Sequence, residues 1–280
     1  MSAQQARKRT MLIPREHGAW GMLLVPLATG AIVASRSGFH AGPLVLFIVT
    51  TLALFWLRTP VEAWLGLSPI KAQTKEERAS VVRLIVLLCA VALASLVAMF
   101  ATGYAHGLVI IGIVAALAFG AQEFVKKLGR SGRMPAQIIG AIGLTSTAAG
   151  AYYVASGRLD RTAVLLWTAN WLFAADQIHF VQTRIRGSRL TTWRDKLDRG
   201  QWFIYAQLAL IVTLAAASAY RLLPPWTLVA FVPALGRGAA WFVRPTQPLD
   251  VHKLGFRELG QAIAFGALVS AAFMIGSISV

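Results

Sequence analysis

Charged residues are scarce in this 280-residue chain, and their scarcity is the first constraint on its class. They make up 14% of the sequence, whereas an ordinary soluble domain has about 25%. A soluble fold of this length would have too few polar groups to cover its surface. Apolar residues account for 57% of the chain, so the composition indicates a protein embedded in lipid.

Cysteine is almost absent, and so are the motifs of several common enzyme classes. The single cysteine, Cys89, lies in an apolar run and fits a small packing residue. One cysteine excludes an internal disulfide and a cysteine-based metal cluster. The sequence also shows no recognisable phosphate-binding loop, Ser-His-Asp set, zinc signature or dinucleotide-binding glycine motif.

Apolar runs recur along the whole chain, each near the roughly 20 residues that a helix needs to cross a bilayer. The candidate spans are residues 17–35, 41–57, 81–101, 105–122, 135–155, 162–182, 202–220, 225–243 and 258–278. This pattern predicts an all-α fold, a polytopic membrane helical bundle of about nine transmembrane helices. We expect a single transmembrane domain over residues 1–280.

Lysine and arginine are distributed unevenly among the segments between these spans. With the N-terminus in the cytoplasm, only four of the 27 fall on the outer side, namely Arg36, Arg158, Arg161 and Arg221. Basic residues favour cytoplasmic loops, so the pattern supports the count and predicts a cytoplasmic N-terminus and an outer C-terminus. Topology and anionic head groups then account for the net charge of +16. Membrane lipids, and no nucleic acid, are the expected partners.

The predicted cytoplasmic segments include a basic tail, residues 1–14, and two long loops, residues 58–80 and 183–200. The tail runs into the first apolar stretch without a small-residue cleavage site, which favours an uncleaved first span over a signal peptide. Both loops begin with polar residues still on the preceding helix. This similarity is typical of a repeat in which the second and sixth spans are equivalent.

Ionisable side chains near the hydrocarbon are costly and often functional, and here they gather at the cytoplasmic ends of a few spans. At the start of the first span, Arg15 and His17 form either a capped helix start or a polar cluster facing a cavity. At the end of the second span, Arg58 and Glu62 share a face if the helix continues. Pro60 argues for a kink or break there, and an interfacial ion pair is the alternative.

The end of the sixth span is the most informative stretch. Asp176 and His179 follow helical spacing, Asn170 adds polarity that a lipid-facing helix would avoid, and Arg184 and Arg186 follow. A lone carboxylate at this depth needs a cation, and His179 or an arginine of the second span could supply it. The alternative is a buried structural pair.

Two resemblances extend this interpretation. The predicted architecture is similar to that of the UbiA-type intramembrane prenyltransferases. It has nine helices, polar motifs at the ends of the second and sixth spans, and a first span that begins with residues 15–26. The phrases at residues 15–20 (Arg-Glu-His-Gly-Ala-Trp) and 57–63 (Leu-Arg-Thr-Pro-Val-Glu-Ala) more specifically resemble the YwiC-like family of bacterial membrane proteins. The YwiC-like resemblance implies a location in the bacterial cytoplasmic membrane and, by itself, no particular activity.

The UbiA resemblance implies two Asp-rich motifs that hold Mg²⁺, which binds the diphosphate of an isoprenoid donor. Mg²⁺ prefers carboxylate oxygens, yet the matching stretches keep only Glu62 and Asp176, with His179 where tyrosine is usual. Catalytic roles therefore fall on Asp176, His179 and Glu62. Two carboxylates are too few for a two-metal diphosphate site, so Mg²⁺ is doubtful and no cofactor is predicted.

Arginines stand where the resemblance leads one to expect acids, and guanidinium groups bind phosphate or carboxylate directly. We therefore expect a basic, cytoplasm-facing cavity that binds or modifies an anionic, isoprenoid or quinone-like lipid without a metal. The expected substrate-binding residues are Arg15, His17, Arg58, Asn170, Arg184 and Arg186. Arg257 or Glu258, at the start of the last span, could reach the same cavity.

Three classes of function stay open at this point. The first is a divergent, prenyltransferase-like enzyme, and the second is a transporter or lipid-binding protein. The third is an accessory subunit of a membrane complex with no chemistry of its own. Polar residues at one membrane edge, without broken helices in the middle, count against the transporter.

Overall fold

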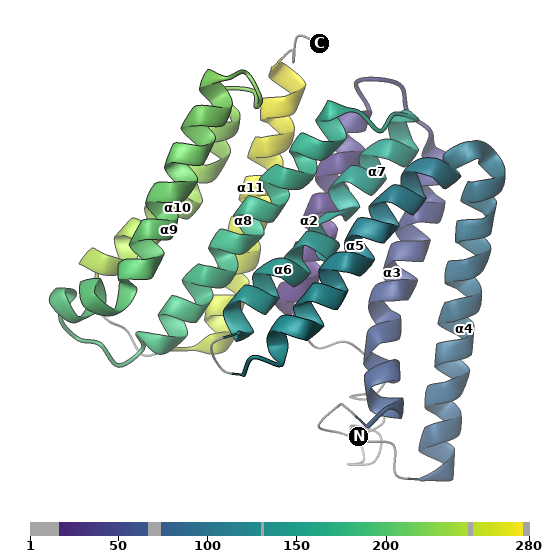
Figure 1. The fold of residues 1–280 in the computed structure, drawn as a ribbon, viewed down its shortest axis with the longest axis horizontal. Coiled ribbons are helices and arrows are strands. Elements are labelled where there is room, and N and C mark those ends of the chain that lie inside the picture. The colour runs from purple at the N-terminus through teal and green to yellow at the C-terminus, as the bar shows by residue number, and fades with distance from the viewer. Residues whose placement is uncertain (1–16, 67–73, 130–131, 246–248, 277–280) are drawn as a thin grey trace. The chain divides into compact units, whose positions relative to one another are not determined.

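The computed structural model describes residues 17–66, 74–129, 132–245 and 249–276, and within these ranges every regular element is a helix (Figure 1). The elements in chain order are α2 (His17–Ala34), α3 (Ala41–Trp64), α4 (Lys75–Met99), the π-helical turn η1 (Phe100–Tyr104), α5 (Ala105–Lys126), α6 (Arg133–Thr145), α7 (Thr147–Ser156), α8 (Arg161–Arg186), α9 (Trp193–Ala219), α10 (Thr227–Val243) and α11 (Val251–Ile275). The prediction of an all-α fold is confirmed.

Local sequence explains where several helices begin and end. Thr74 and Glu77 form a reciprocal capping box that starts α4, each side chain accepting the other's backbone N–H. Asp160 and Asp250 cap α8 and α11 by accepting backbone N–H groups of the first turn. Gly157 ends α7 in the left-handed conformation, with φ of 73°, which glycine adopts without steric cost.

Five helical stretches among the described residues are long and apolar enough to cross a membrane: Ala41–Trp64, Lys75–Lys126, Arg133–Ser156, Trp193–Ala219 and Val251–Ile275. They indicate a multi-pass membrane protein. The longest is interrupted at Gly103, whose φ is 95°, and Gly18–Ala34 and Thr227–Val243 are apolar but shorter. The count of nine spans stays a prediction.

The two long loops expected from the sequence are corrected by the structure. Helix α3 continues through the buried Pro60 to Trp64, and α4 already begins at Lys75. Likewise α8 runs to Arg186 and α9 begins at Trp193, where Thr192 accepts a hydrogen bond from the Asp195 N–H. Most of the described residues within 58–80 and 183–200 therefore belong to helices, and the chain does not leave the helix at Pro60.

The chain divides into two compact units, residues 1–17 with 40–106 and residues 18–39 with 107–280. In the first, α3 and α4 pack along each other and bury Phe47, Ala53 and Val81. The Tyr104 hydroxyl also lies 3.0 Å from the His40 Nδ1 atom in this unit. The expectation of one transmembrane domain stays a prediction.

The second unit is organised around α8, which contacts α6, α7, α9, α10 and α11. Close packing at its centre depends on small residues: a Cβ on Gly30 of α2 would lie 2.1 Å from the carbonyl oxygen of Ala148 on α7. The rings of Phe173 and Phe265 stack with centroids 4.1 Å apart and join α8 to α11. The polar side chains of Asn170, Asp176 and Gln177 on α8 are buried inside the unit.

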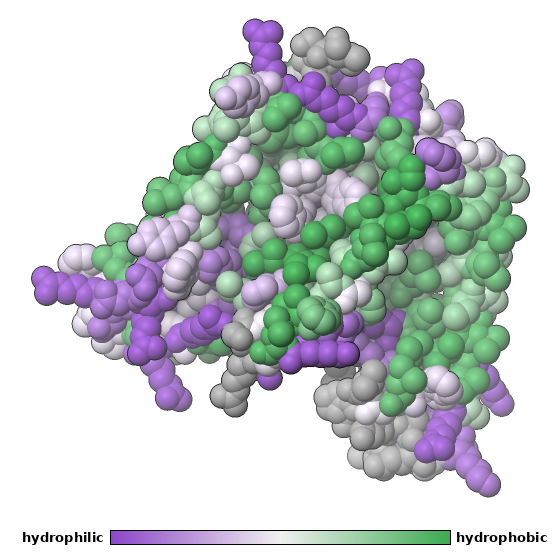
Figure 2. Space-filling model, in the orientation of Figure 1, coloured by the Kyte–Doolittle hydropathy of each residue, from purple (hydrophilic) through white to green (hydrophobic). Residues whose placement is uncertain are grey.

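Large apolar side chains are exposed on the outer helices, as expected for surfaces that face lipid. Exposed examples are Val212 on α9, Val232 on α10 and Ile263 on α11. In the visible face, apolar residues cover the middle of the helices and hydrophilic residues gather at their ends (Figure 2). This distribution agrees with the membrane assignment.

Candidate functional site

Three ionisable side chains meet inside the second unit, and we call them the ion cluster: Asp176 on α8, Arg237 on α10 and Glu258 on α11. The Arg237 Nη2 atom lies 2.7 Å from Asp176 Oδ2, and its Nη1 atom donates to Glu258 Oε2. The exposed fractions of the three side chains are 2%, 11% and 8% in chain order. A guanidinium thus joins two carboxylates from two other helices in a buried setting.

Neutral side chains complete the hydrogen bonding of the ion cluster. Gln207 of α9 donates to Asp176 Oδ1, and Gln177 of α8 donates to the backbone oxygen of Glu258 at 2.8 Å and to its Oε2 at 3.2 Å. The guanidinium carbon of Arg237 lies 4.2 Å from the centre of the Phe180 ring, a cation–π contact. Four helices therefore contribute polar groups to one buried point.

The ion cluster contains the cation that pairs with Asp176. We expected His179 or an arginine of the second span, but the partner is Arg237, so that expectation is wrong. The His179 ring instead packs edge-on against Phe203, with centroids 5.2 Å apart. Among the described residues no hydrogen bond or ion pair joins Asp176 to His179.

Arg237 is a residue that sequence reasoning missed as a site candidate, because it was counted as a loop charge. A usable signal was present: a lone arginine flanked by Gly236 and Gly238 inside an apolar run. Such a charge at membrane depth needs a buried partner. The glycine at 238 also brings α10 close to α9, since a Cβ there would lie 3.1 Å from the Phe203 ring.

Asn170 takes part in helix packing. It is 2% exposed, and its amide donates to the Thr29 hydroxyl at 3.1 Å and to the Leu166 carbonyl at 2.9 Å. The first of these bonds connects α8 with α2. The second lies within α8, so the described contacts of the Asn170 amide nitrogen fix helices rather than line a cavity.

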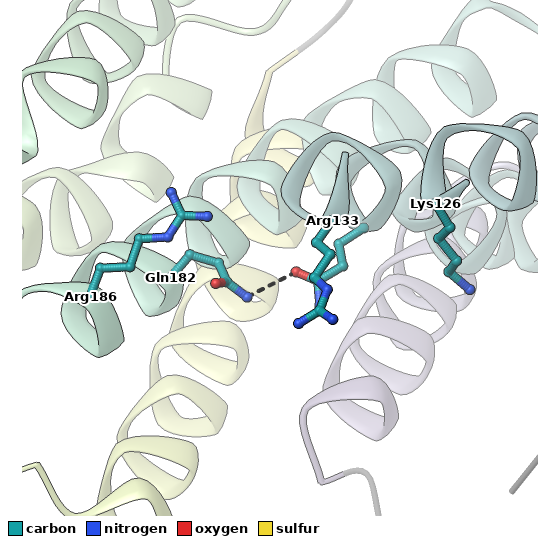
Figure 3. A pocket seen from close by; sticks show the side chains of 5 residues that line it. Lys126, Arg133, Gln182 and Arg186 are labelled. Atoms are coloured by element: carbon teal, nitrogen blue, oxygen red, sulfur yellow. Dashed lines mark hydrogen bonds between the residues drawn. The ribbon is translucent and has the colours of Figure 1, made fainter. Parts of the chain in front are cut away.

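A basic pocket, the second feature of this unit, is lined by Lys126 of α5, Arg133 and Gln137 of α6, and Gln182 and Arg186 of α8. Its volume is about 680 Å³. Figure 3 shows these side chains around one hollow, with the Gln182 amide donating to Gln137 Oε1 at 3.1 Å. None of these described lining residues carries a carboxylate.

The two arginines of the basic pocket differ from its lysine in their partners. Lys126 forms an ion pair with Glu123 one turn earlier, at 2.5 Å. Within the described part of the chain, the guanidinium groups of Arg133 and Arg186 have no hydrogen-bond or ion-pair partner. Two unpaired guanidinium groups in a hollow can bind phosphate or carboxylate oxygens of a ligand.

Further basic groups lie near the ends of these helices. Arg184 of α8 is half-buried and interacts electrostatically with Arg257 and Glu258. Lys196 is 2% exposed and donates to the carbonyl oxygens of Trp241 at 3.1 Å and Arg244 at 2.6 Å. It thereby satisfies carbonyls at the C-terminal end of α10, a role that sequence reasoning did not identify.

The remaining predicted residues lie elsewhere. Arg58 and Glu62 belong to the first unit, where the Arg58 Nε atom lies 2.7 Å from Glu62 Oε1 and both side chains are exposed. The continued helix therefore does place them on one face. Arg15 lies outside the described residues, as does the side chain of His17.

Among the described residues, no group of three or more His, Cys, Asp and Glu side chains is placed to hold a metal ion.

Residues 13–153 match the family model described as YwiC-like protein. A comparison with curated proteins gave no match.

Proposed function

The chain belongs to the YwiC-like family, and from this premise we propose that it is a membrane protein that binds the anionic head group of a lipid in the basic pocket. The observation that carries the proposal is the pair of unpartnered guanidinium groups, Arg133 and Arg186, within the described pocket lining. Guanidinium forks match the oxygens of phosphate, and the two amides of Gln137 and Gln182 add neutral donors.

The position of these residues on their helices favours a head group over a ligand in the hydrocarbon. Lys126 is the last residue of α5, Arg133 the first of α6 and Arg186 the last of α8. Charged residues at the ends of membrane helices lie near the head-group layer. Among the described residues no side chain caps the start of α6, where Gly132 is the N-cap, so the first backbone N–H groups of this helix can add donors.

We extend the proposal to the topology. If the N-terminus is cytoplasmic, the positive-inside distribution puts the basic pocket at the cytoplasmic face, where anionic lipids concentrate. A bundle of nine spans resembling the UbiA type would open its cavity on the same side. The pocket residues at the end of α5, the start of α6 and the end of α8 support this position, because helix ends lie at the membrane surface.

We propose that the acidic residues Asp176 and Glu62 have no catalytic role, and that the protein binds its ligand without acting on it. Asp176 is engaged by Arg237 and Gln207, and Glu62 is engaged by Arg58. A general base or a metal ligand needs a carboxylate that is available to substrate or metal. The ion pairs leave these carboxylates committed to the protein itself.

A binding titration tests the proposal. The purified protein in a neutral detergent is titrated with micelles containing dioleoylphosphatidylglycerol, and binding is followed by microscale thermophoresis. Dioleoylphosphatidylcholine is the comparison lipid, and inorganic phosphate in a parallel arm shows whether the free anion suffices. We expect saturable binding of phosphatidylglycerol with weak or no binding of phosphatidylcholine.

Variants assign the site. Arg186→Gln and Arg133→Gln each weaken phosphatidylglycerol binding about tenfold or more, because a charge-assisted hydrogen bond contributes roughly 1.5–3 kcal/mol. The matched control is Arg158→Gln, which removes the same charge from the exposed turn before α8. Equal binding by the wild type, Arg186→Gln and Arg133→Gln would overturn the proposal.

A further inference from the structure

The charges of the ion cluster are unequal, because it holds two acids and one base. Asp176 and Glu258 are two acids, and among the described residues Arg237 is the base that forms an ion pair with each of them. Gln207 and Gln177 donate hydrogen bonds without adding charge. Two carboxylates that share one cation repel each other, and such pairs bind protons as a coupled unit.

The charged and titratable groups on the surrounding helices do not remove this feature. On α8 they are His179, which packs on Phe203, and Arg184, which interacts with both Glu258 and Arg257 of α11. On α9, the Lys196 ammonium is committed to carbonyl oxygens at the end of α10. The other basic groups on the packed helices and at their described ends are Arg133, Arg161, Arg186, Arg194, Arg199, Arg244, His252 and Lys253, and the other carboxylates there are Asp160, Asp195, Asp198 and Asp250. Asp160 is half-buried at the start of α8, and the carboxylates of Asp195, Asp198 and Asp250 are exposed, so among the described residues of this unit Asp176 and Glu258 are the buried acids at which an added proton neutralises a charge.

Helix α8 carries residues of both the ion cluster and the basic pocket. Asp176 and Gln177 belong to the first, while Gln182 and Arg186 line the second. At a rise of 1.5 Å per residue, Asp176 and Arg186 are roughly 15 Å apart along the helix axis. A change of charge at Asp176 therefore changes the electrostatic potential at Arg186.

We propose that the ion cluster is a proton-binding site whose occupancy sets the affinity of the basic pocket for its anion. This inference rests on the proposed function. A proton on Asp176 or Glu258 removes a negative charge from the neighbourhood of the pocket, so anion binding becomes tighter. By thermodynamic linkage, anion binding must in turn favour uptake of the proton.

Elementary electrostatics gives the expected size. One charge removed about 15 Å away, at an effective dielectric constant near 20, changes the anion affinity by roughly threefold to tenfold. Affinity rises as pH falls, because the protonated cluster repels the anion less. Phosphatidylglycerol is a suitable probe, since its phosphodiester keeps one negative charge between about pH 5 and pH 8.

The test measures phosphatidylglycerol affinity at several values between about pH 5 and pH 8 for the wild type and two variants. Asp176→Asn combined with Glu258→Gln keeps the shape of the cluster and removes both proton sites. His179→Gln is the matched control, because it removes the half-buried titratable neighbour on the same helix. We expect the pH dependence to disappear in the double variant and to persist in His179→Gln.

A second measurement does not depend on the double variant folding. The weakly buffered wild-type protein and the His179→Gln protein are mixed with phosphatidylglycerol micelles near pH 6, and proton uptake is read with a pH-indicator dye. Uptake of a fraction of a proton per bound lipid by both proteins supports the inference. No uptake by either protein overturns it.

The outcomes separate the two proposals. Binding that depends on Arg186 but shows no pH dependence, or keeps its pH dependence in the double variant, overturns the proton site and leaves the pocket in place. Binding that is absent at every pH, or is indifferent to Arg133→Gln and Arg186→Gln, overturns the pocket and the inference together.

Discussion

Arg237 of α10 and Asp176 of α8 form a buried ion pair, with 2.7 Å between Nη2 and Oδ2, although 61 positions separate them in the chain. The same guanidinium also binds Glu258 of α11. Three helices are thus fixed to one another by a side chain in an otherwise apolar segment. This arrangement has measurable consequences for stability.

Arg237→Met should be strongly destabilising, since it preserves bulk but leaves two buried carboxylates without their cation. Removing one partner of a buried ion pair costs about 3–5 kcal/mol. Thermal unfolding of the purified protein in detergent measures the effect, with Arg158→Met as an exposed control. A melting temperature for Arg237→Met equal to that of the control would contradict the role assigned to Arg237.

Gly30→Ala should destabilise the second unit, because the new Cβ would lie 2.1 Å from the Ala148 carbonyl oxygen and push α2 away from α7. Gly112→Ala is the matched control: it is also a helical glycine, but open space surrounds its Cβ position. Alanine is favoured over glycine in helices by about 1 kcal/mol, so the control should be as stable as the wild type or more so. The two melting temperatures, measured side by side, test the close packing of α2.

Lys196→Met should lower stability by about 1–3 kcal/mol, the cost of leaving buried acceptors without a donor. The ammonium donates to the Trp241 and Arg244 carbonyl oxygens at the end of α10. Lys253→Met, on an exposed lysine, provides the comparison. If both variants unfold at the same temperature, the buried lysine is not what holds this end of α10.

Arg58→Ala should change the unfolding free energy by less than about 0.5 kcal/mol, because its ion pair with Glu62 is exposed and joins residues four apart on one helix. The same variant tests whether Arg58 takes part in lipid binding, as the sequence predicts. Unchanged phosphatidylglycerol affinity would remove Arg58 from the binding residues. A loss comparable to that of Arg186→Gln would place it among them.

The orientation in the membrane is tested by cysteine labelling. Cys89 is the only native cysteine, so Cys89→Ser provides a background for Arg158→Cys and Ser188→Cys, at the two ends of α8. With a cytoplasmic N-terminus, a membrane-impermeant maleimide should label position 158 in intact cells and position 188 only after permeabilisation. The reverse pattern would contradict the predicted topology.

The membrane class and the all-α fold could be read from the sequence, and the predicted apolar runs overlap the helices of the structure. They follow from local properties: runs of apolar residues, capping residues such as Asp160 and Asp250, and glycines such as Gly157 that end a helix. Asp176 could also be singled out, because a carboxylate in an apolar stretch is costly wherever the stretch folds. The predicted loops are longer than those of the structure, because charged residues such as Arg58, Arg184 and Arg186 are compatible with continued helix ends.

Only the tertiary structure decided which groups meet. The cation for Asp176 comes from α10 rather than from His179 three residues away, and the pocket around Arg186 takes its other arginine, Arg133, from α6. Sequence spacing determines neighbours within one helix, whereas contacts between helices depend on their rotation and depth, which are set by packing at points such as Gly30 and Gly238. The sequence by itself therefore determined that this is a helical membrane protein with costly charges, and the packing of the helices decided what those charges bind.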